Sequence, residues 1–74
     1  MKLKFTYHAQ FHLSYDRGHP TDNIKQTILY PDFENLLSDG RIVSEKKVEN
    51  NVLRVIYTRD RNKYVILSFY YLNK

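Results

Sequence analysis

The sequence contains no cysteine, and it has only two glycines and two prolines among 74 residues. Without cysteine it forms no disulfide framework and no thiolate metal site, which excludes a secreted, disulfide-rich domain. No stretch approaches the roughly 20 consecutive apolar residues that span a bilayer. Residues 1–5 are followed by Thr and Tyr rather than by the apolar run of a signal peptide. We therefore expect a cytoplasmic protein without a membrane segment.

The composition is that of a folded chain, with 42% hydrophobic, 15% aromatic and 27% charged residues. These fractions exclude a disordered, collagenous or low-complexity chain. The length permits one hydrophobic core and no second one. We expect a single domain over residues 1–74, with a core so thin that nearly every aliphatic residue contributes to it.

Positive charge is concentrated in the second half of the chain. The net charge is +4, with residues 1–40 contributing −1 and residues 41–74 contributing +5. A basic segment favours a polyanion such as RNA, or an acidic protein, as partner. Solubility alone also accounts for a few net charges.

The first part of the chain changes from a strand pattern to a helix pattern. Residues 2–6 alternate polar and apolar side chains, which is typical of a half-buried strand. Tyr7, Phe11 and Tyr15 then recur every four residues, which predicts a helix over residues 7–17 with this aromatic stripe against a sheet.

A second helix is predicted after a glycine. Gly18 is expected to end the first helix, and Thr21 is suited to cap the next one. Ile24 and Ile28 form its apolar stripe, and Pro31 disfavours helical geometry in the preceding residue.

The remaining sequence has the pattern of strands. Asp-Gly at residues 39–40 is a strong signal for a two-residue hairpin turn, and Asn-Asn at 50–51 marks another turn. Residues 52–59 and 63–72 are rich in β-branched and aromatic side chains. We predict an α+β fold in the order N-terminal strand, two helices and a three- to four-stranded antiparallel sheet, with both helices on one face.

The hydrophobic pattern also predicts a register for the last hairpin. A three-residue loop at 60–62 would place Arg59 opposite Lys63, whereas a two-residue loop would set Arg54 opposite Phe69 and mix the faces. The first register collects one apolar face, which holds Leu53, Val55, Tyr57, Val65, Leu67, Phe69 and Tyr71.

The other face of this hairpin is predicted to be functional. It gathers Arg54, Ser68 and Tyr70, beside Ile56 and Ile66. Two short helices cannot cover both faces of the sheet, so this face is expected to meet the target.

Several short motifs resemble a known family. They are His8-Ala9, Arg17-Gly18, Thr21-x-x-Ile24, Ile28, Pro31-Asp32 and Asn51-Val52-Leu53-Arg54-Val55. In these the chain resembles a small prokaryotic domain family of unknown function that is distantly similar to the RelE/ParE and BrnT toxins. The resemblance implies a RelE-like element order, metal-free RNA cleavage and an antitoxin partner. The family has Arg four residues after its His-Ala motif, where this chain has His12.

Metal-free RNA cleavage needs an acid, a base and fixed positive charge on the phosphate. His is the side-chain type that titrates near neutrality, and His8 and His12 share a helix face, so they are the candidate acid and base. Arg54 is the candidate phosphate clamp and Tyr70 a hydrogen-bond or proton donor. Both histidines are also compatible with an ordinary, partly exposed helix surface. RNA contacts are expected from Arg17, Arg59, Arg61, Lys63, Tyr64 and Ser68.

The same helix spacing could also form a zinc site. His8, His12 and Asp16 recur every four residues, but Ala9 stands where metalloproteases carry Glu. We expect neither a metal nor a cofactor.

Three classes of function therefore fit the sequence. The first is a toxin-like endoribonuclease with a cognate antitoxin. The second is a non-catalytic RNA- or protein-binding module, and the third is an antitoxin or inhibitor that turns its basic sheet to an acidic protein. A homo-oligomer is compatible with each.

Overall fold

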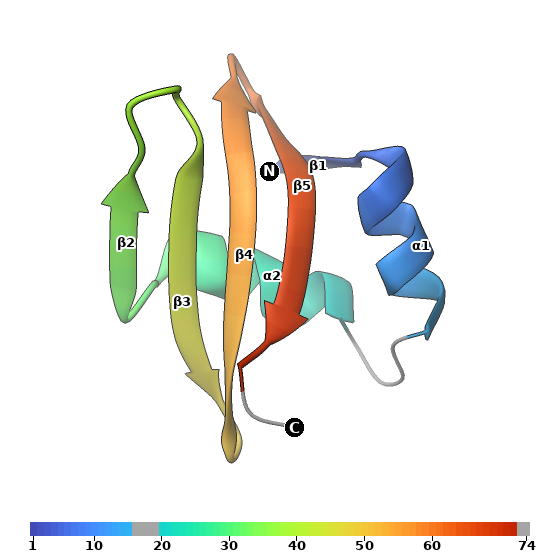
Figure 1. Cartoon of the computed structure of the whole chain (residues 1–74), viewed down its shortest axis with the longest axis vertical. Helices are drawn as coiled ribbons and strands as arrows, with labels where there is room; N and C mark the ends of the chain where they lie inside the picture. Colours follow the sequence, from blue (N-terminus) through green and yellow to red (C-terminus); the bar gives the residue numbers. More distant parts are fainter. Residues whose placement is uncertain (16–19, 73–74) are drawn as a thin grey trace.

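The computed structural model describes residues 1–15 and 20–72. Two helices and a sheet fold together in these ranges (Figure 1). In chain order the elements are β1 (Lys2–Phe5), α1 (Tyr7–Tyr15), α2 (Pro20–Leu29), β2 (Phe33–Leu36), β3 (Ile42–Val48), β4 (Asn51–Asp60) and β5 (Lys63–Tyr71).

The five strands form one mixed sheet in the order β1-β5-β4-β3-β2. Strands β2 to β5 pair antiparallel in sequence order, and β1 joins at the other edge, parallel to β5. The predicted α+β class is confirmed. The four strands that follow the helices pair antiparallel, and the sheet as a whole is mixed because β1 adds a parallel pair that the sequence did not predict.

A two-residue loop closes the β4–β5 hairpin. Arg61 and Asn62 form the loop, and Asp60 lies opposite Lys63. Arg61 has a φ of 55°, in the left-handed region that tight hairpin turns require. The predicted three-residue loop, with Arg59 opposite Lys63, is therefore wrong.

A β-bulge allows this short loop without mixing the faces of the hairpin. Tyr57 lies opposite Ile66, but Ile56 lies opposite Ser68, so Leu67 is an extra residue in β5. A two-residue loop mixes the faces of the hairpin only if side chains alternate along β5 without interruption. The bulge breaks that period and changes which residues of β5 face the helices.

The faces of β5 near the loop therefore differ from the prediction. Ile66, expected on the polar face, is fully buried, and Tyr64 packs against the same core. Val65, expected in the core, lies opposite Thr58 on the other face. Leu67, also expected in the core, is half-buried at the bulge.

The other two hairpins form where turns were predicted, with different loops. Between β2 and β3 the loop spans residues 37–41, so the two-residue turn at 39–40 is wrong, although Gly40 does adopt a φ of 91°. Between β3 and β4 the loop is Glu49-Asn50, with Val48 opposite Asn51. Glu49 takes the left-handed φ of 58° there.

Helix α1 packs beside β1 and β5 with a different face from the predicted one. Tyr7 is 90% exposed and Phe11 58% exposed, whereas Ala9 is fully buried and Leu13 packs against the core. Tyr7 and Phe11, two members of the predicted aromatic stripe, therefore do not face the sheet. The small Ala9 side chain is what lets the helix backbone approach β5 closely. The predicted helix end at Gly18 lies outside the described residues.

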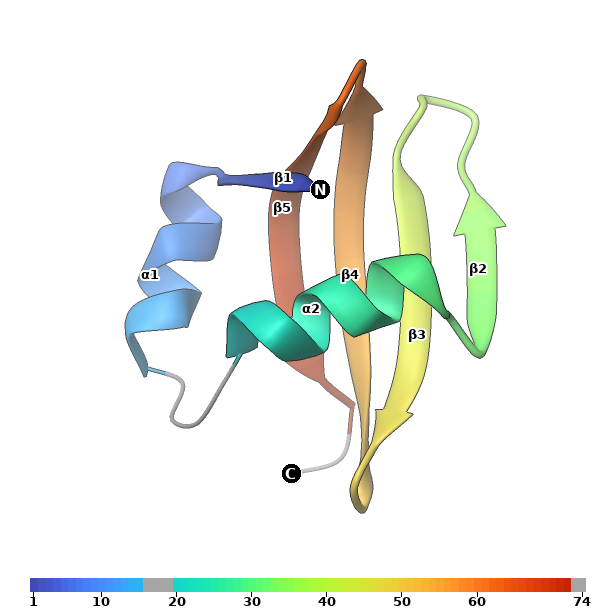
Figure 2. The same ribbon diagram turned by 180° about the vertical axis from the view of Figure 1, so that it is seen from behind.

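Helix α2 crosses β3 and β4 on one face of the sheet (Figure 2). Its buried residues are Ile24, Thr27 and Ile28, which confirms the predicted isoleucine stripe. The helix includes Pro20 at its first position, where a missing N–H costs nothing. Thr21 therefore lies within the helix and is not its cap.

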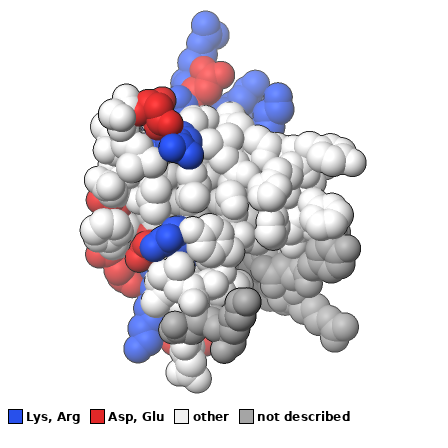
Figure 3. Space-filling model, in the orientation of Figure 1, with Lys and Arg blue, Asp and Glu red and all other residues white. Residues whose placement is uncertain are grey.

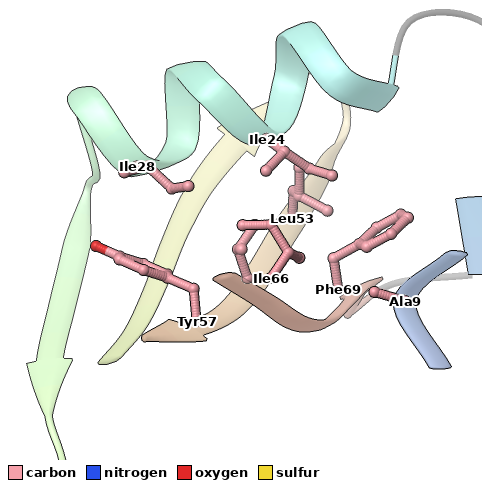
Figure 4. Packing of buried hydrophobic residues seen from close by; sticks show 8 residues of the cluster. Ala9, Ile24, Ile28, Leu53, Tyr57, Ile66 and Phe69 are labelled. Atoms are coloured by element: carbon pink, nitrogen blue, oxygen red, sulfur yellow. The ribbon is translucent and has the colours of Figure 1, made fainter. Parts of the chain in front are cut away.

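The core lies between the sheet and these helices (Figure 4). Its buried hydrophobic members are Ala9, Ile24, Ile28, Leu53, Val55, Tyr57, Ile66 and Phe69. Neither helix within the described ranges has the length and apolar character that crossing a membrane requires.

Candidate functional site

Neither of the two helices in the described residues covers the sheet face that is turned to the viewer in Figure 1, which we call the open face. Strand alternation and pairing assign to it Lys2, Lys4, Phe33, Asn35, Val43, Glu45, Lys47, Val52, Arg54, Ile56, Thr58, Asp60, Lys63, Val65, Ser68 and Tyr70. Five of these residues are cations and two are anions, and most of the surface seen in Figure 3 belongs to uncharged residues. The open face therefore carries an excess of cations on a largely uncharged surface.

Three neighbouring strands of the open face contribute to a hydrogen-bonded cluster. Glu45 on β3, Arg54 on β4 and Tyr70 on β5 are cross-strand neighbours. Arg54 Nε donates to Glu45 Oε2 at 2.8 Å, and Arg54 Nη1 donates to the Tyr70 hydroxyl at 2.9 Å. These bonds, first that with Tyr70 and then that with Glu45, raise the pKa of the Arg54 guanidinium.

The cluster fixes the position of Tyr70, and it leaves little uncompensated positive charge on Arg54. The carboxylate of Glu45 compensates Arg54, so a phosphate clamp at Arg54 would have to displace an existing partner. Tyr70 remains 38% exposed, and the Arg54 guanidinium lies 5.6 Å from the centre of its ring. Ser68 lies on the same face, opposite Ile56.

Sequence reasoning missed Glu45. The signal that would have found it is the alternation of β3, which puts Glu45 on the same face as Val43 and opposite Arg54. Without the β3–β4 register the pairing of these charges could not be read.

The two histidines form a separate pair on α1. Their Nε2 atoms lie 3.2 Å apart, so one ring donates a hydrogen bond and the other accepts it. The His12 ring packs edge-on against Phe69, a core residue on the helix-covered face. The candidate acid–base pair and Arg54 with Tyr70 are thus on different sides of the sheet, and the structure does not assemble them into one site.

Cations gather at the end of the sheet where β1 begins and the β4–β5 loop turns. We call Lys2, Arg59, Arg61 and Lys63 the cationic end; Lys and Arg atoms are visible over the loop at the top of Figure 3. The Arg59 guanidinium lies 5.7 Å from the centre of the Tyr64 ring.

Not all residues that were expected to contact RNA lie at this end of the open face. Tyr64 packs on the covered face against Tyr57, which takes it away from the open face where it was expected to contact RNA. Arg17 lies outside the described residues.

A pocket occupies the open-face side of the cationic end. Its lining residues are Lys2, Asp60, Arg61, Asn62 and Lys63. Lys2 and Asn62 were not among the residues that the sequence singled out. Parallel pairing brings Lys2 beside Lys63 although 61 positions separate them in the sequence, and local patterns do not reveal such a contact.

No group of three His, Asp or Glu side chains in the described ranges is placed to hold a metal ion. Asp16, the third member of the histidine spacing weighed for zinc, lies outside those ranges.

Comparisons with protein-family models, with curated proteins and with solved structures give no match to this chain. The resemblance to toxin families stays a prediction from the motifs.

Proposed function

We propose that this protein binds single-stranded RNA, with bases on the open face and phosphates at the cationic end. The observation that carries this proposal is the set of unpaired cations at one end of an uncovered, mostly uncharged sheet face. The side chains of Lys2, Arg61 and Lys63 form no hydrogen bond or ion pair with the residues that the structure describes. Free cations beside a surface that admits bases are what sequence-tolerant binding of a single strand requires.

Tyr70 is the stacking platform in this proposal. The residue is 38% exposed, and the hydrogen bond from Arg54 limits its motion, so a base would meet a surface that is already ordered. Tyr70 lies seven positions after Lys63 in β5, which corresponds to about 23 Å along an extended strand. A ligand that touches both must therefore be several nucleotides long.

Binding of a fluorescently labelled, unstructured RNA oligonucleotide, followed by anisotropy, tests the proposal. Tyr70→Leu should weaken binding about tenfold, since loss of one base–aromatic stack costs about 1–3 kcal/mol. Tyr70→Phe keeps the ring and should bind nearly as well as the parent chain. Tyr30→Leu is the matched control, because Tyr30 is 64% exposed and lies before β2, outside the open face.

Two outcomes would contradict RNA binding at this face. One is the absence of any binding at low ionic strength. The other is equal weakening by Tyr70→Leu and Tyr30→Leu, which would show that the loss in RNA affinity does not depend on the position of the tyrosine on the open face.

A toxin-like endoribonuclease restrained by an antitoxin is the second candidate. The hydrogen bond between His8 and His12 favours it, because one imidazole nitrogen donates and the other accepts, and these are the roles of a general acid and a general base. RNA incubated with the protein and EDTA should then be cleaved, and His8→Asn and His12→Asn should each abolish cleavage while anisotropy is unchanged. Intact RNA with the parent chain, or cleavage by both variants, would eliminate this candidate.

A further inference from the structure

Two lysines lie directly opposite each other on the open face. Lys2 of β1 is the Cα partner of Lys63 of β5, and the parallel register puts both side chains on the same face. Like charges in opposite positions of neighbouring strands destabilise a sheet. Neither ammonium group has a hydrogen-bond or ion-pair partner within the described part of the chain.

The β4–β5 loop adds donors to the same place. Arg61 and Asn62 line the pocket together with the two lysines, and Asp60 is its one acidic lining residue. Three cations and one carboxylate leave a local charge of +2. The pocket therefore combines excess positive charge with ammonium, guanidinium and amide donors, all of which suit phosphate oxygens.

We propose that this pocket binds a phosphomonoester dianion. A monoester carries a charge of about −1.5 to −2 at pH 7 and three strong acceptor oxygens, which match the local charge and the number of donors. A phosphodiester of an RNA backbone has a single charge and would leave part of the positive charge unmatched. The bound phosphate would also separate Lys2 from Lys63 and remove their repulsion.

Two sources could supply this phosphate. One is the phosphorylated end of an RNA strand whose bases lie on the open face, and for this source the inference rests on the proposed function. The other source is a small phosphomonoester that enters the pocket alone. The two share the same chemistry at the pocket and differ in whether the open face takes part.

Three oligonucleotides of one sequence distinguish these sources, with a 5′-phosphate, a 3′-phosphate or hydroxyl groups at both ends. One phosphorylated form should bind about five- to tenfold more tightly than the hydroxyl form, as expected for a charge-assisted contact. This preference should fade as pH falls below about 6, where the phosphate loses its second charge.

Lys63→Met should remove the preference, so that the phosphorylated and hydroxyl forms bind with affinities within about threefold of each other, and it should weaken binding of both forms because one phosphate contact is lost. Lys47→Met is the matched control, since Lys47 is also an exposed lysine of the open face but lies on β3, outside the pocket. Arg61→Gly is a second pocket variant that suits the local backbone, because Gly tolerates the φ of 55° at this position.

Titration with inorganic phosphate, followed by amide NMR shifts, provides the readout that does not depend on RNA. Shifts at residues 60–63 that disappear in Lys63→Met but persist in Lys47→Met support the pocket, even if no oligonucleotide binds and the proposed function fails. If all three oligonucleotides bind equally and inorganic phosphate shifts nothing at 60–63, the pocket proposal is overturned while RNA binding stands.

Discussion

Tyr57 carries a hydroxyl group into the core between β4 and α2. The residue is 3% exposed, and its Oη lies 3.4 Å from Oγ of the fully buried Ser44. Burial is the main cause that raises the pKa of Tyr57 above its ordinary value. The folded protein thus holds this proton more tightly than the unfolded chain does.

This shift makes stability depend on alkaline pH. The contribution of Tyr57 is fully present below about pH 10, the pKa of an unperturbed tyrosine, and is lost as pH rises through the higher pKa of the folded state. We expect Tyr57→Phe to flatten the alkaline fall in the free energy of unfolding, measured by urea denaturation. At neutral pH the same substitution should cost about 1 kcal/mol, because Ser44 loses its partner.

The exposed Tyr30 supplies the control for this experiment. Tyr30→Phe should leave the alkaline limb as steep as in the parent chain. A Tyr57→Phe variant with an unchanged limb would show that the burial of this phenol has no thermodynamic consequence.

Thr6 joins three elements at the start of α1. Its Oγ1 accepts a hydrogen bond from the Ala9 N–H at 3.2 Å, as a helix N-cap does, and donates to the Leu67 carbonyl at 3.2 Å. Its own N–H donates to the Ile66 carbonyl. The bulge in β5 is thus tied to the cap of the first helix.

We expect Thr6→Ala to lower the free energy of unfolding by about 1 kcal/mol, since it removes the cap and leaves the Leu67 carbonyl without this donor. Thr6→Ser keeps the hydroxyl and should recover most of the loss. Urea denaturation measures both variants. Equal destabilisation by Ala and Ser would assign the effect to the methyl group of Thr6 rather than to its hydrogen bonds.

The orientation of α1 gives a second test at the level of elements. Tyr7→Ser should change stability by less than about 0.5 kcal/mol, because the side chain is 90% exposed. Ala9→Leu should cost about 1–3 kcal/mol, because added volume at a fully buried contact forces the helix away from β5. The reverse ranking in thermal or urea denaturation would support the aromatic stripe as the buried face.

At the scale of the whole molecule, folding converts a charge difference along the sequence into a charged end. Arg54 is paired with Glu45 and Arg41 with Asp39, so these cations are compensated where they stand. The side chains of Lys2, Arg61 and Lys63 have no such partner among the described residues, and they lie together where β1 pairs with β5, beside the β4–β5 loop.

The salt dependence of RNA binding should report how many phosphates the cationic end contacts. Three phosphate contacts to single-stranded RNA predict a slope of about −2 for log K against log salt concentration. Lys2→Met should reduce the slope by about 0.7, whereas Lys47→Met should leave it unchanged. A slope near zero, measured by anisotropy over a salt series, would contradict electrostatic recognition at the cationic end.

The parts of the fold that follow from neighbouring residues were predicted from the sequence alone. The α+β class, the isoleucine stripe of α2, the end of α2 before Pro31 and the hairpins near residues 39–40 and 50–51 were all foreseen. Each depends on side-chain period or turn chemistry within a few residues, so local energies are sufficient to determine it.

Tertiary structure alone decided the features on which the site depends. The bulge at Leu67, the burial of Ala9 rather than Tyr7, the partner of Arg54 and the meeting of Lys2 with Lys63 all join residues distant in the sequence. A register or a helix orientation is chosen by the total packing of the sheet and helices, to which a local pattern contributes a small part. The last hairpin places Arg54, Ser68 and Tyr70 on one uncovered face, as its side-chain alternation predicted, whereas the Glu45 partner of Arg54 and the Lys2 side of the pocket come from the third and first strands.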